Sequence, residues 1–285
     1  MHLHKIATSG GLVFDAWIDG PADGELVLLL HGYPQSRHTW RHQLPALAAA
    51  GYRAVAPDQR GYSPGARPDP SDLSNYHYDR LIADVLDLAA ACGRGVGRFH
   101  LVGHDWGGQV SWGVAARHPD RLASLTVLSR PHPASFVRAL QDDPEQKHRS
   151  RHHRAFLDAG TARLLLDDDA RRLRRNLAEA GVPADAVADY VSVLGTPAAM
   201  EAALAWYRAR DGLRTPLGKI SVPTLYLWGD ADATVGRMAA EGTAEFVSGP
   251  YRFEVLPGLG HFITDEAIGP VNAALLAHLR AFPAR

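Results

Sequence analysis

The chain is 285 residues long and has a formal net charge of −1. This near-neutral balance gives no reason to expect nucleic acid or an anionic membrane surface as a partner. The single cysteine, Cys92, excludes an internal disulfide and is typical of the reducing cytoplasm. The first residues lack the apolar segment of a signal peptide, and no apolar run is long enough to predict a membrane-spanning helix. We therefore expect a single-domain cytoplasmic protein that does not insert into a membrane.

Short apolar runs rich in β-branched residues alternate with helical patterns along most of the chain. This alternation is typical of a parallel sheet with crossover helices. The predicted strands are Leu12–Ile18, Leu26–Leu30, Arg53–Ala56, His100–Val102, Ser124–Leu128, Thr224–Trp228 and Arg252–Leu256. The predicted helices are Trp40–Ala50, Tyr78–Cys92, Gly107–Arg117 and Glu266–Leu279. Leu26–Leu30 has no polar alternation, so we expect this strand to be covered on both faces.

The alternation stops between about Arg130 and Pro216, where the pattern is helical and charged. We interpret this stretch as an insertion, a helical cap of residues 131–216 on a core of residues 1–130 and 217–285. The basic clusters Lys147–Arg154 and Arg171–Arg175 fall inside the predicted cap. We expect them to be solvated faces of cap helices, with attraction of an anionic substrate as the alternative.

The segment Gly103–Gly108, which reads GHDWGG, follows a predicted strand and opens a predicted helix. In this context the pattern predicts a nucleophile elbow, a turn so sharp that it needs glycine on both sides. The turn lifts its central side chain above the sheet, close to the amides at the helix N-terminus. Aspartate, Asp105, stands where serine is usual. We therefore predict that Asp105 is a nucleophile, and an ordinary helix N-cap is the alternative.

A carboxylate nucleophile needs a base for the second half of the reaction. His261 lies in a Pro/Gly-rich loop after the last predicted strand, where a catalytic histidine is expected. The acid that orients it should lie between nucleophile and histidine in the sequence. Asp232 fits this order because it follows the exit of the strand Thr224–Trp228, and Asp230 is its competitor.

The loop His31–Pro34 directly follows the predicted buried strand Leu26–Leu30. It can bring the backbone N–H of Tyr33 opposite the backbone N–H of Trp106. Two such donors form an oxyanion hole, and each is worth roughly 3 kcal/mol of barrier.

These motifs together resemble the α/β-hydrolase superfamily, and the resemblance covers the whole predicted core. It rests on His31–Pro34, Asp58–Ser63, the elbow at Asp105, and the pair Asp232 and His261. It implies a mostly parallel central sheet flanked by helices, with a helical cap inserted after the sixth strand. An aspartate nucleophile followed by tryptophan resembles the branch of epoxide hydrolases and haloalkane dehalogenases, and it disfavours serine esterases and lipases.

The predicted cap resembles that of epoxide hydrolases at Ala203–Arg208, which implies for Tyr207 the role of an oxirane-protonating tyrosine. Family members usually carry a second such tyrosine earlier in the cap, but the matching region, Ser150–Phe156, has none. Either His152 or His153 replaces it, or the chemistry is not epoxide opening. The resemblance leads us to expect substrate contacts from His31, Pro34, His152, His153, Trp206 and Phe262.

We therefore predict an enzyme that opens an epoxide to a vicinal diol through an alkyl ester on Asp105. Water activated by His261 and Asp232 then hydrolyses this ester. The alternatives are a haloalkane or haloacid dehalogenase with the same triad, a biosynthetic enzyme for one complex metabolite, and a ligand receptor on this scaffold. We expect a small apolar or amphipathic organic substrate and no metal or organic cofactor. The sequence leaves the oligomeric state open.

Overall fold

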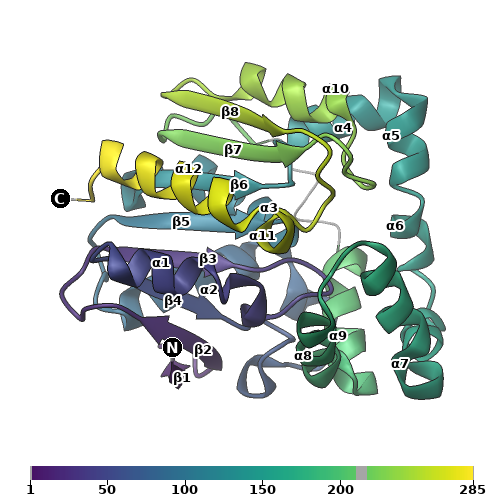
Figure 1. Cartoon of the computed structure of the whole chain (residues 1–285). Coiled ribbons are helices and arrows are strands. Elements are labelled where there is room, and N and C mark those ends of the chain that lie inside the picture. Colours follow the sequence, from purple (N-terminus) through teal and green to yellow (C-terminus); the bar gives the residue numbers. More distant parts are fainter. Residues whose placement is uncertain (1, 210–216, 285) are drawn as a thin grey trace.

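A computed structural model describes residues 2–209 and 217–284, and its centre is one eight-stranded sheet (Figure 1). The strand order is β1-β2-β4-β3-β5-β6-β7-β8. The strands are β1 (His2–Ala7), β2 (Val13–Asp19), β3 (Leu26–Leu30), β4 (Arg53–Pro57), β5 (Phe99–His104), β6 (Leu122–Leu128), β7 (Thr224–Gly229) and β8 (Tyr251–Leu256). β2 runs antiparallel to β1 and to β4, and the other neighbours are parallel. The mostly parallel sheet confirms the predicted fold class.

The sequence predicted each of these strands except β1. All five side chains of β3 are buried, as expected for an uninterrupted apolar run covered on both faces. In contrast, Ile6 is the one buried side chain of β1. β1 is an edge strand that forms through backbone pairing with β2, from His2–Ile18 to Ala7–Val13. Its own residues carry no apolar alternation that would have revealed it.

Helices cover both faces of the sheet (Figure 1). α1 and α12 share one apolar cluster with inward-facing residues of β3 and β4, whereas α2 and α3 belong to the cluster on the opposite face. The helices of the core are α1 (Gln43–Ala49), α2 (Tyr78–Ala91), α3 (Trp106–Arg117), α10 (Arg237–Glu241), α11 (Ile263–Glu266) and α12 (Ile268–Ala281).

The predicted helix Trp40–Ala50 is two elements, the 3-10 helix Arg37–Trp40 and α1. Pro45 has no N–H to continue a helix from upstream, so a new helix starts just before it. The predicted helix Glu266–Leu279 is likewise divided between α11 and α12.

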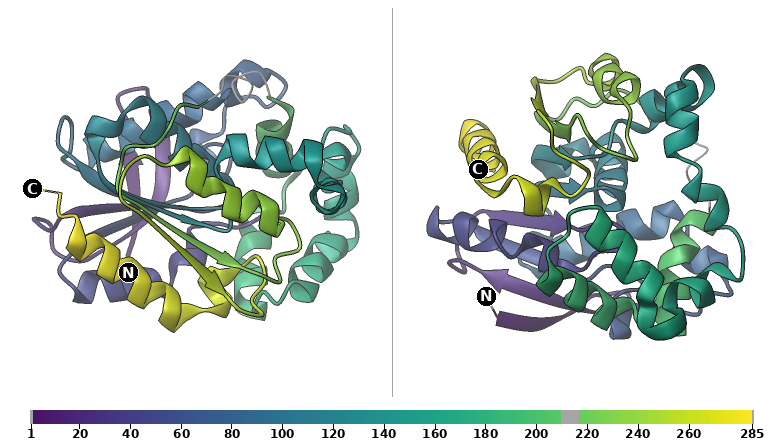
Figure 2. Two further views of the ribbon diagram at one scale, coloured as in Figure 1. Left: turned by 90° about the horizontal axis from the view of Figure 1, so that it is seen from above. Right: turned by 45° about the vertical axis from the view of Figure 1, so that its right-hand side comes forward.

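Among the described residues between β6 and β7 there are six helices, which we call the cap helices. They are α4 (Pro133–Asp142), α5 (Pro144–Arg149), α6 (His152–Ala155), α7 (Thr161–Glu179), α8 (Ala184–Leu194) and α9 (Pro197–Arg208). Figures 1 and 2 show them at one side of the molecule, with α7, α8 and α9 gathered together. α7 is interrupted at Asp167–Ala170 by non-helical backbone angles. The predicted boundary between residues 216 and 217 adjoins residues 210–216, which lie outside the described residues.

The parallel strands β3, β5, β6, β7 and β8 end at the same edge of the sheet. In open α/β sheets this carboxyl edge is where ligands bind, because the loops that follow the strands converge there. Along the described ranges, no helix combines the length and the apolar character needed to cross a membrane.

Candidate active site

Asp105 lies in the turn that joins β5 to α3. Its backbone has φ 50° and ψ −116°, a conformation that residues other than glycine rarely adopt. Hydrogen bonds hold the turn, from the Asp105 N–H to the Leu128 carbonyl (3.1 Å) and from the Gln109 N–H to the Asp105 carbonyl (2.8 Å). A Cβ at Gly107 would lie 2.1 Å from the Leu30 carbonyl oxygen, so glycine is required where α3 starts against the end of β3. The strained backbone and the close approach have the geometry of a nucleophile elbow.

The side chains of Asp105, His261 and Asp232 form a continuous row. Nδ1 of His261 lies 2.8 Å from Oδ2 of Asp232, and Nε2 of His261 lies 3.6 Å from Oδ2 of Asp105. The competitor Asp230 is directed elsewhere, because its Oδ1 accepts a hydrogen bond from the Gly258 N–H at 2.7 Å. Asp232 is fully buried, so its carboxylate is held where solvent cannot compete for the histidine.

In this row, burial and the neighbouring charges shift the pKa values in opposite directions. Burial disfavours a charged His261, but the negative charge of Asp232 and the interaction with Asp105 outweigh it and raise the pKa of His261 to about 10. Burial alone would raise the pKa of Asp105, but the interaction with His261 lowers it below the ordinary value. Likewise the charge of His261 outweighs burial and lowers the pKa of Asp232. All three shifts favour the charged forms, an imidazolium between two carboxylates.

The loop after β3 brings a backbone donor to the Asp105 carboxylate. The Tyr33 N–H donates a hydrogen bond to Oδ1 of Asp105 at 3.0 Å. A Cβ at Gly32 would lie 2.4 Å from Cβ of Asp105, so only glycine lets the loop come this close. Trp106 is the first residue of α3, and N–H groups in the first turn of a helix have no partner within it. The Tyr33 N–H thus contacts the Asp105 carboxylate, and the Trp106 N–H stays the predicted second donor.

A cavity of about 210 Å³ opens above Asp105, between the carboxyl edge of the sheet and the cap helices. Its lining includes the predicted site residues Tyr33, Pro34, Asp105, His152, His153, Tyr207, His261 and Phe262. Phe156 joins them and packs edge-on against Tyr33 and Tyr207, at ring distances of 5.1 Å and 4.8 Å. Sequence reasoning did not single out Phe156, which forms part of an aromatic wall on the cap side of the cavity.

Tyr207, in α9, is a buried tyrosine of this wall. It is the residue predicted to protonate an oxirane oxygen. Burial and the nearby negative charge of Asp105 raise the pKa of Tyr207 well above its ordinary value of 10. The phenol is therefore protonated at neutral pH and can donate its proton or a hydrogen bond. Its ring lies 5.0 Å from that of Trp106 and 5.6 Å from that of His153.

The two cap histidines differ in what they can donate. Nδ1 of His152 lies 2.9 Å from the Arg149 carbonyl oxygen. Burial lowers the pKa of His152, so the ring is neutral and carries its one proton on Nδ1, toward that carbonyl. Nε2 of His152 is then an acceptor and cannot protonate a leaving oxygen. His153, which packs against Tyr207, is the better candidate for a second donor on the cap side.

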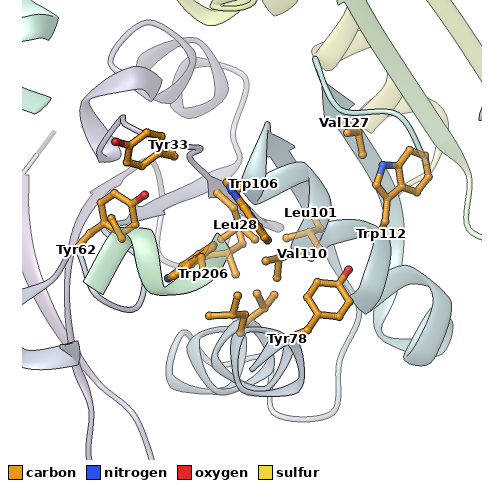
Figure 3. Close-up of a cluster of buried hydrophobic side chains, with 14 of the residues drawn as sticks. Leu28, Tyr33, Tyr62, Tyr78, Leu101, Trp106, Val110, Trp112, Val127 and Trp206 are labelled. Atoms are coloured by element: carbon orange, nitrogen blue, oxygen red, sulfur yellow. The ribbon is translucent and has the colours of Figure 1, made fainter. Parts of the chain in front are cut away.

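Two of the residues expected to contact substrate lie outside the cavity. His31 is fully buried, and its Nε2 accepts a hydrogen bond from the Gln59 N–H at 3.1 Å. Trp206 donates from its indole N–H to the Arg60 carbonyl at 3.0 Å. Its ring packs edge-on against that of Trp106, beside which Figure 3 shows it. Their side chains hold the loop after β3 and the cap helix α9 in place. Direct substrate contacts from His31 and Trp206 stay a prediction, although neither side chain lines this cavity.

Sequence reasoning also missed polar residues that support His261. Oγ1 of Thr234 lies 2.8 Å from Oδ1 of Asp232 and 2.8 Å from Nδ1 of His261. The His104 ring is fully buried between Gln35 Oε1 and the His261 carbonyl, at 2.8 Å from each, and burial lowers its pKa to about 4. The sequence does place His104 in the elbow and Thr234 in the loop of Asp232, close to the predicted site. Position alone could not show that they support His261, because a histidine or a threonine there has many possible partners.

Comparison with known proteins agrees with this architecture. Residues 25–267 match the family model of the alpha/beta hydrolase fold. The chain therefore belongs to the α/β-hydrolase fold family.

Relatives and solved structures indicate to which branch of this family the chain is most similar. Epoxide hydrolase A of Mycobacterium tuberculosis is 35% identical over 309 residues, covering 93% of this chain and 94% of the relative. Epoxide hydrolase 3 of Xenopus tropicalis is 31% identical over 95% of this chain and 75% of its own length. The crystal structure of epoxide hydrolase A from Mycobacterium thermoresistibile superposes with a TM-score of 0.85 at 30% identity, covering 100% and 99% of the two chains. Within its family, the chain is an epoxide hydrolase-like enzyme.

Proposed function

We propose that this enzyme hydrolyses an epoxide to a vicinal diol through a covalent alkyl ester on Asp105. The observation that carries the proposal is a carboxylate at the elbow whose two oxygens face different groups. Oδ1 accepts the hydrogen bond of the Tyr33 N–H, and Oδ2 faces Nε2 of His261. The names of the relatives support an oxirane as the electrophile.

In the first half-reaction, Oδ2 of Asp105 attacks one oxirane carbon. Oδ1 is held by a backbone donor, which leaves Oδ2 as the freer nucleophile. The C–O bond of the oxirane breaks, and the oxygen develops the charge of a strongly basic alkoxide. Tyr207 lies on the cap side of the same cavity and gives its proton to that oxygen.

In the second half-reaction, water attacks the ester carbonyl carbon. Ester formation removes the negative charge of Asp105, which is one of the two charges that hold a proton on His261. The pKa of His261 then falls, the ring releases its resting proton to solvent, and the neutral ring can take a proton from water. The N–H groups of Tyr33 and Trp106 stabilise the oxyanion. His261 returns this proton to the leaving alkoxide, and ionisation of the regenerated Asp105 restores the proton that Tyr207 gave. The restored charge of Asp105 raises the pKa of His261 again, so the ring regains its resting proton from solvent.

The substrate class follows from the cavity walls. Aromatic and aliphatic side chains surround the reacting groups, and Phe156, Leu165 and Leu173 are among them. Such walls suit a small apolar or amphipathic organic epoxide. We also infer a reducing compartment, the cytoplasm, because the single cysteine cannot form an internal disulfide.

An isotope experiment tests the ester mechanism. Excess enzyme is mixed with styrene oxide in H₂¹⁸O, so that each molecule turns over once at most. We expect an unlabelled diol, because its new oxygen comes from the carboxylate, and ¹⁸O in the tryptic peptide that contains Asp105. Solvent label in the diol of this first turnover would show direct attack by water and refute the proposal.

A further inference from the structure

A second, larger cleft adjoins the cavity above Asp105. It has a volume of about 810 Å³ and is lined by residues of α3 and of the cap helices α4, α5, α6 and α9. Figure 1 shows α4, α5 and α6 following one another along the side of the molecule. The cleft and the cavity share Arg130, Phe136, His153 and Tyr207 as lining residues. A molecule that fills both can therefore reach from the surface to the nucleophile.

Part of the cleft wall is apolar and open to solvent. Val137 and Leu157, which line it, are 52% and 43% exposed. Phe136 and Trp106 continue this apolar surface inward and are buried. An apolar path from an exposed rim to a buried cavity suits a chain or ring system longer than the cavity itself.

Basic side chains also line the cleft. Arg130, Lys147, Arg151 and Arg154 line it, and its described lining contains no aspartate or glutamate. Within residues 2–209 and 217–284, none of these four forms an ion pair with a carboxylate. Lys147 donates to the Gln141 carbonyl, and Arg151 contacts His148. The cleft therefore carries four positive charges that have no carboxylate within ion-pair distance among the described residues.

Neighbouring basic residues behave differently. Arg138 is in an ion pair with Glu245 at 2.7 Å, and Arg149 is in an ion pair with Glu145. Arg149 also donates to the Asp232 carbonyl, which links it to the catalytic row. Within the basic cluster Lys147–Arg154, Arg149 is thus held by contacts inside the protein. Lys147, Arg151 and Arg154 face the cleft instead.

Arg130 stands at the junction of the two spaces. Its guanidinium donates twice to Oε1 of the buried Gln109, at 2.9 Å and 2.7 Å, and lies 4.5 Å from the centre of the Phe136 ring. These contacts fix its position beside the cavity. Lys147, Arg151 and Arg154 are exposed and lie farther out, at the rim.

We propose that this cleft binds the anionic end of an amphipathic epoxide, with a carboxylate on Arg151 and Arg154 and the oxirane in the cavity above Asp105. The planar guanidinium matches a carboxylate with two parallel hydrogen bonds, which favours arginine for this task. The assignment of an oxirane rests on the proposed function, whereas the anion site rests on the cleft alone.

The test compares two epoxides with the same carbon chain, a terminal epoxide with an ω-carboxylate and its methyl ester, which is uncharged and larger by one methyl group. The measured quantity is the ratio of their kcat/KM values. We expect the native enzyme to prefer the carboxylate, and we expect added salt to reduce this preference by screening. In the double variant Arg151→Gln/Arg154→Gln the ratio should fall by about tenfold, as for two partly screened charge contacts.

A matched control removes the same charge elsewhere. Arg171 and Arg175 are exposed residues of α7 that do not line the cleft, and Arg171→Gln/Arg175→Gln should leave the ratio unchanged. An equal loss in both double variants would show a general field effect and overturn the proposed site. A native ratio near one, unaffected by Arg151→Gln/Arg154→Gln, would also overturn it.

Binding of the two corresponding diols, measured by calorimetry, separates this inference from the proposed function. If neither epoxide is turned over but the diol carboxylate binds more tightly, and Arg151→Gln/Arg154→Gln abolishes the difference, the anion site stands and epoxide hydrolysis fails. Equal affinities of the native enzyme for both diols would refute the anion site, whatever the activity.

Discussion

Nε2 of His261 lies 3.6 Å from Oδ2 of Asp105, too far for a strong hydrogen bond but close enough for the two charges to interact strongly. Each of the two groups therefore sets the charge of the other. An attack that turns the Asp105 carboxylate into a neutral ester also removes one reason for His261 to be protonated. This coupling gives the order of events in the proposed mechanism, with alkylation first and base catalysis second.

This coupling predicts a pKa change that can be measured without any substrate. The pKa of His261 is raised to about 10, above its unfolded value of 6.5, so the protonated form stabilises the fold below pH 6.5 and this contribution is lost as the pH rises toward 10. Asp105→Asn removes one carboxylate, so the pKa of His261 should fall. Titration of ¹⁵N-labelled imidazole by NMR measures it in both proteins. An unchanged pKa in the variant would mean that Asp105 does not control His261.

The ester intermediate should accumulate when the base is removed. In His261→Gln, alkylation of Asp105 remains but water is no longer activated, so intact-protein mass spectrometry should show the enzyme plus one epoxide. Peptide mapping should place the added mass on Asp105, and Asp105→Asn treated in the same way should show none. Residual turnover in His261→Gln without any adduct under single-turnover conditions would count against nucleophilic catalysis.

The acid that orients His261 should be Asp232 and not Asp230. Of these two aspartates, Asp232 contacts the ring, at 2.8 Å, while Asp230 accepts a hydrogen bond from the Gly258 N–H. Asp232→Asn should lower the rate of ester hydrolysis by on the order of 10⁴, the cost of the comparable change in a related triad. Asp230→Asn should change it little. Stopped-flow single turnovers measure both, and similar losses in the two variants would contradict the assignment.

Tyr207 should assist the opening of the ring. A phenol held protonated in the cavity can neutralise the alkoxide, a contribution typically worth 10²–10⁴-fold. Tyr207→Phe should slow alkylation by about that factor and leave hydrolysis of a preformed ester nearly unchanged. If alkylation slows much less than this, His153→Ala in the Tyr207→Phe background tests the second donor. His152→Ala is the matched control, because the proton of His152 points to the Arg149 carbonyl.

Thr234 should act as a positioning residue for the acid and the base. Its hydroxyl lies 2.8 Å from Asp232 and 2.8 Å from His261, whereas its backbone N–H bonds to Asp232 separately, at 2.7 Å. Thr234→Val keeps the shape and the backbone bond and removes the hydroxyl. One such hydrogen bond contributes about 1 kcal/mol, so we expect ester hydrolysis to slow by about fivefold. Thr234→Ser should restore the rate, which a purely steric role of the side chain would not predict.

The sequence by itself determined the buried strands, the sharp turn at Asp105 and the order of the candidate site residues. The uninterrupted run Leu26–Leu30 predicted a strand buried on both faces, and glycines around Asp105 predicted a sharp strand-to-helix turn. The order of Asp105, Asp232 and His261 along the chain indicated which three side chains would lie in one row. These features follow from local sequence, because backbone conformation and the alternation of apolar residues are set by neighbours in the chain.

Only the tertiary structure decided which side chains meet. β1 owes its existence to pairing with β2, since its own residues bury little. Trp206 belongs behind Trp106 instead of in the cavity, and Arg130 stands between two spaces formed by segments far apart in the sequence. The direction of a side chain depends on what packs around it after distant segments have come together. No spacing within one segment encodes that direction.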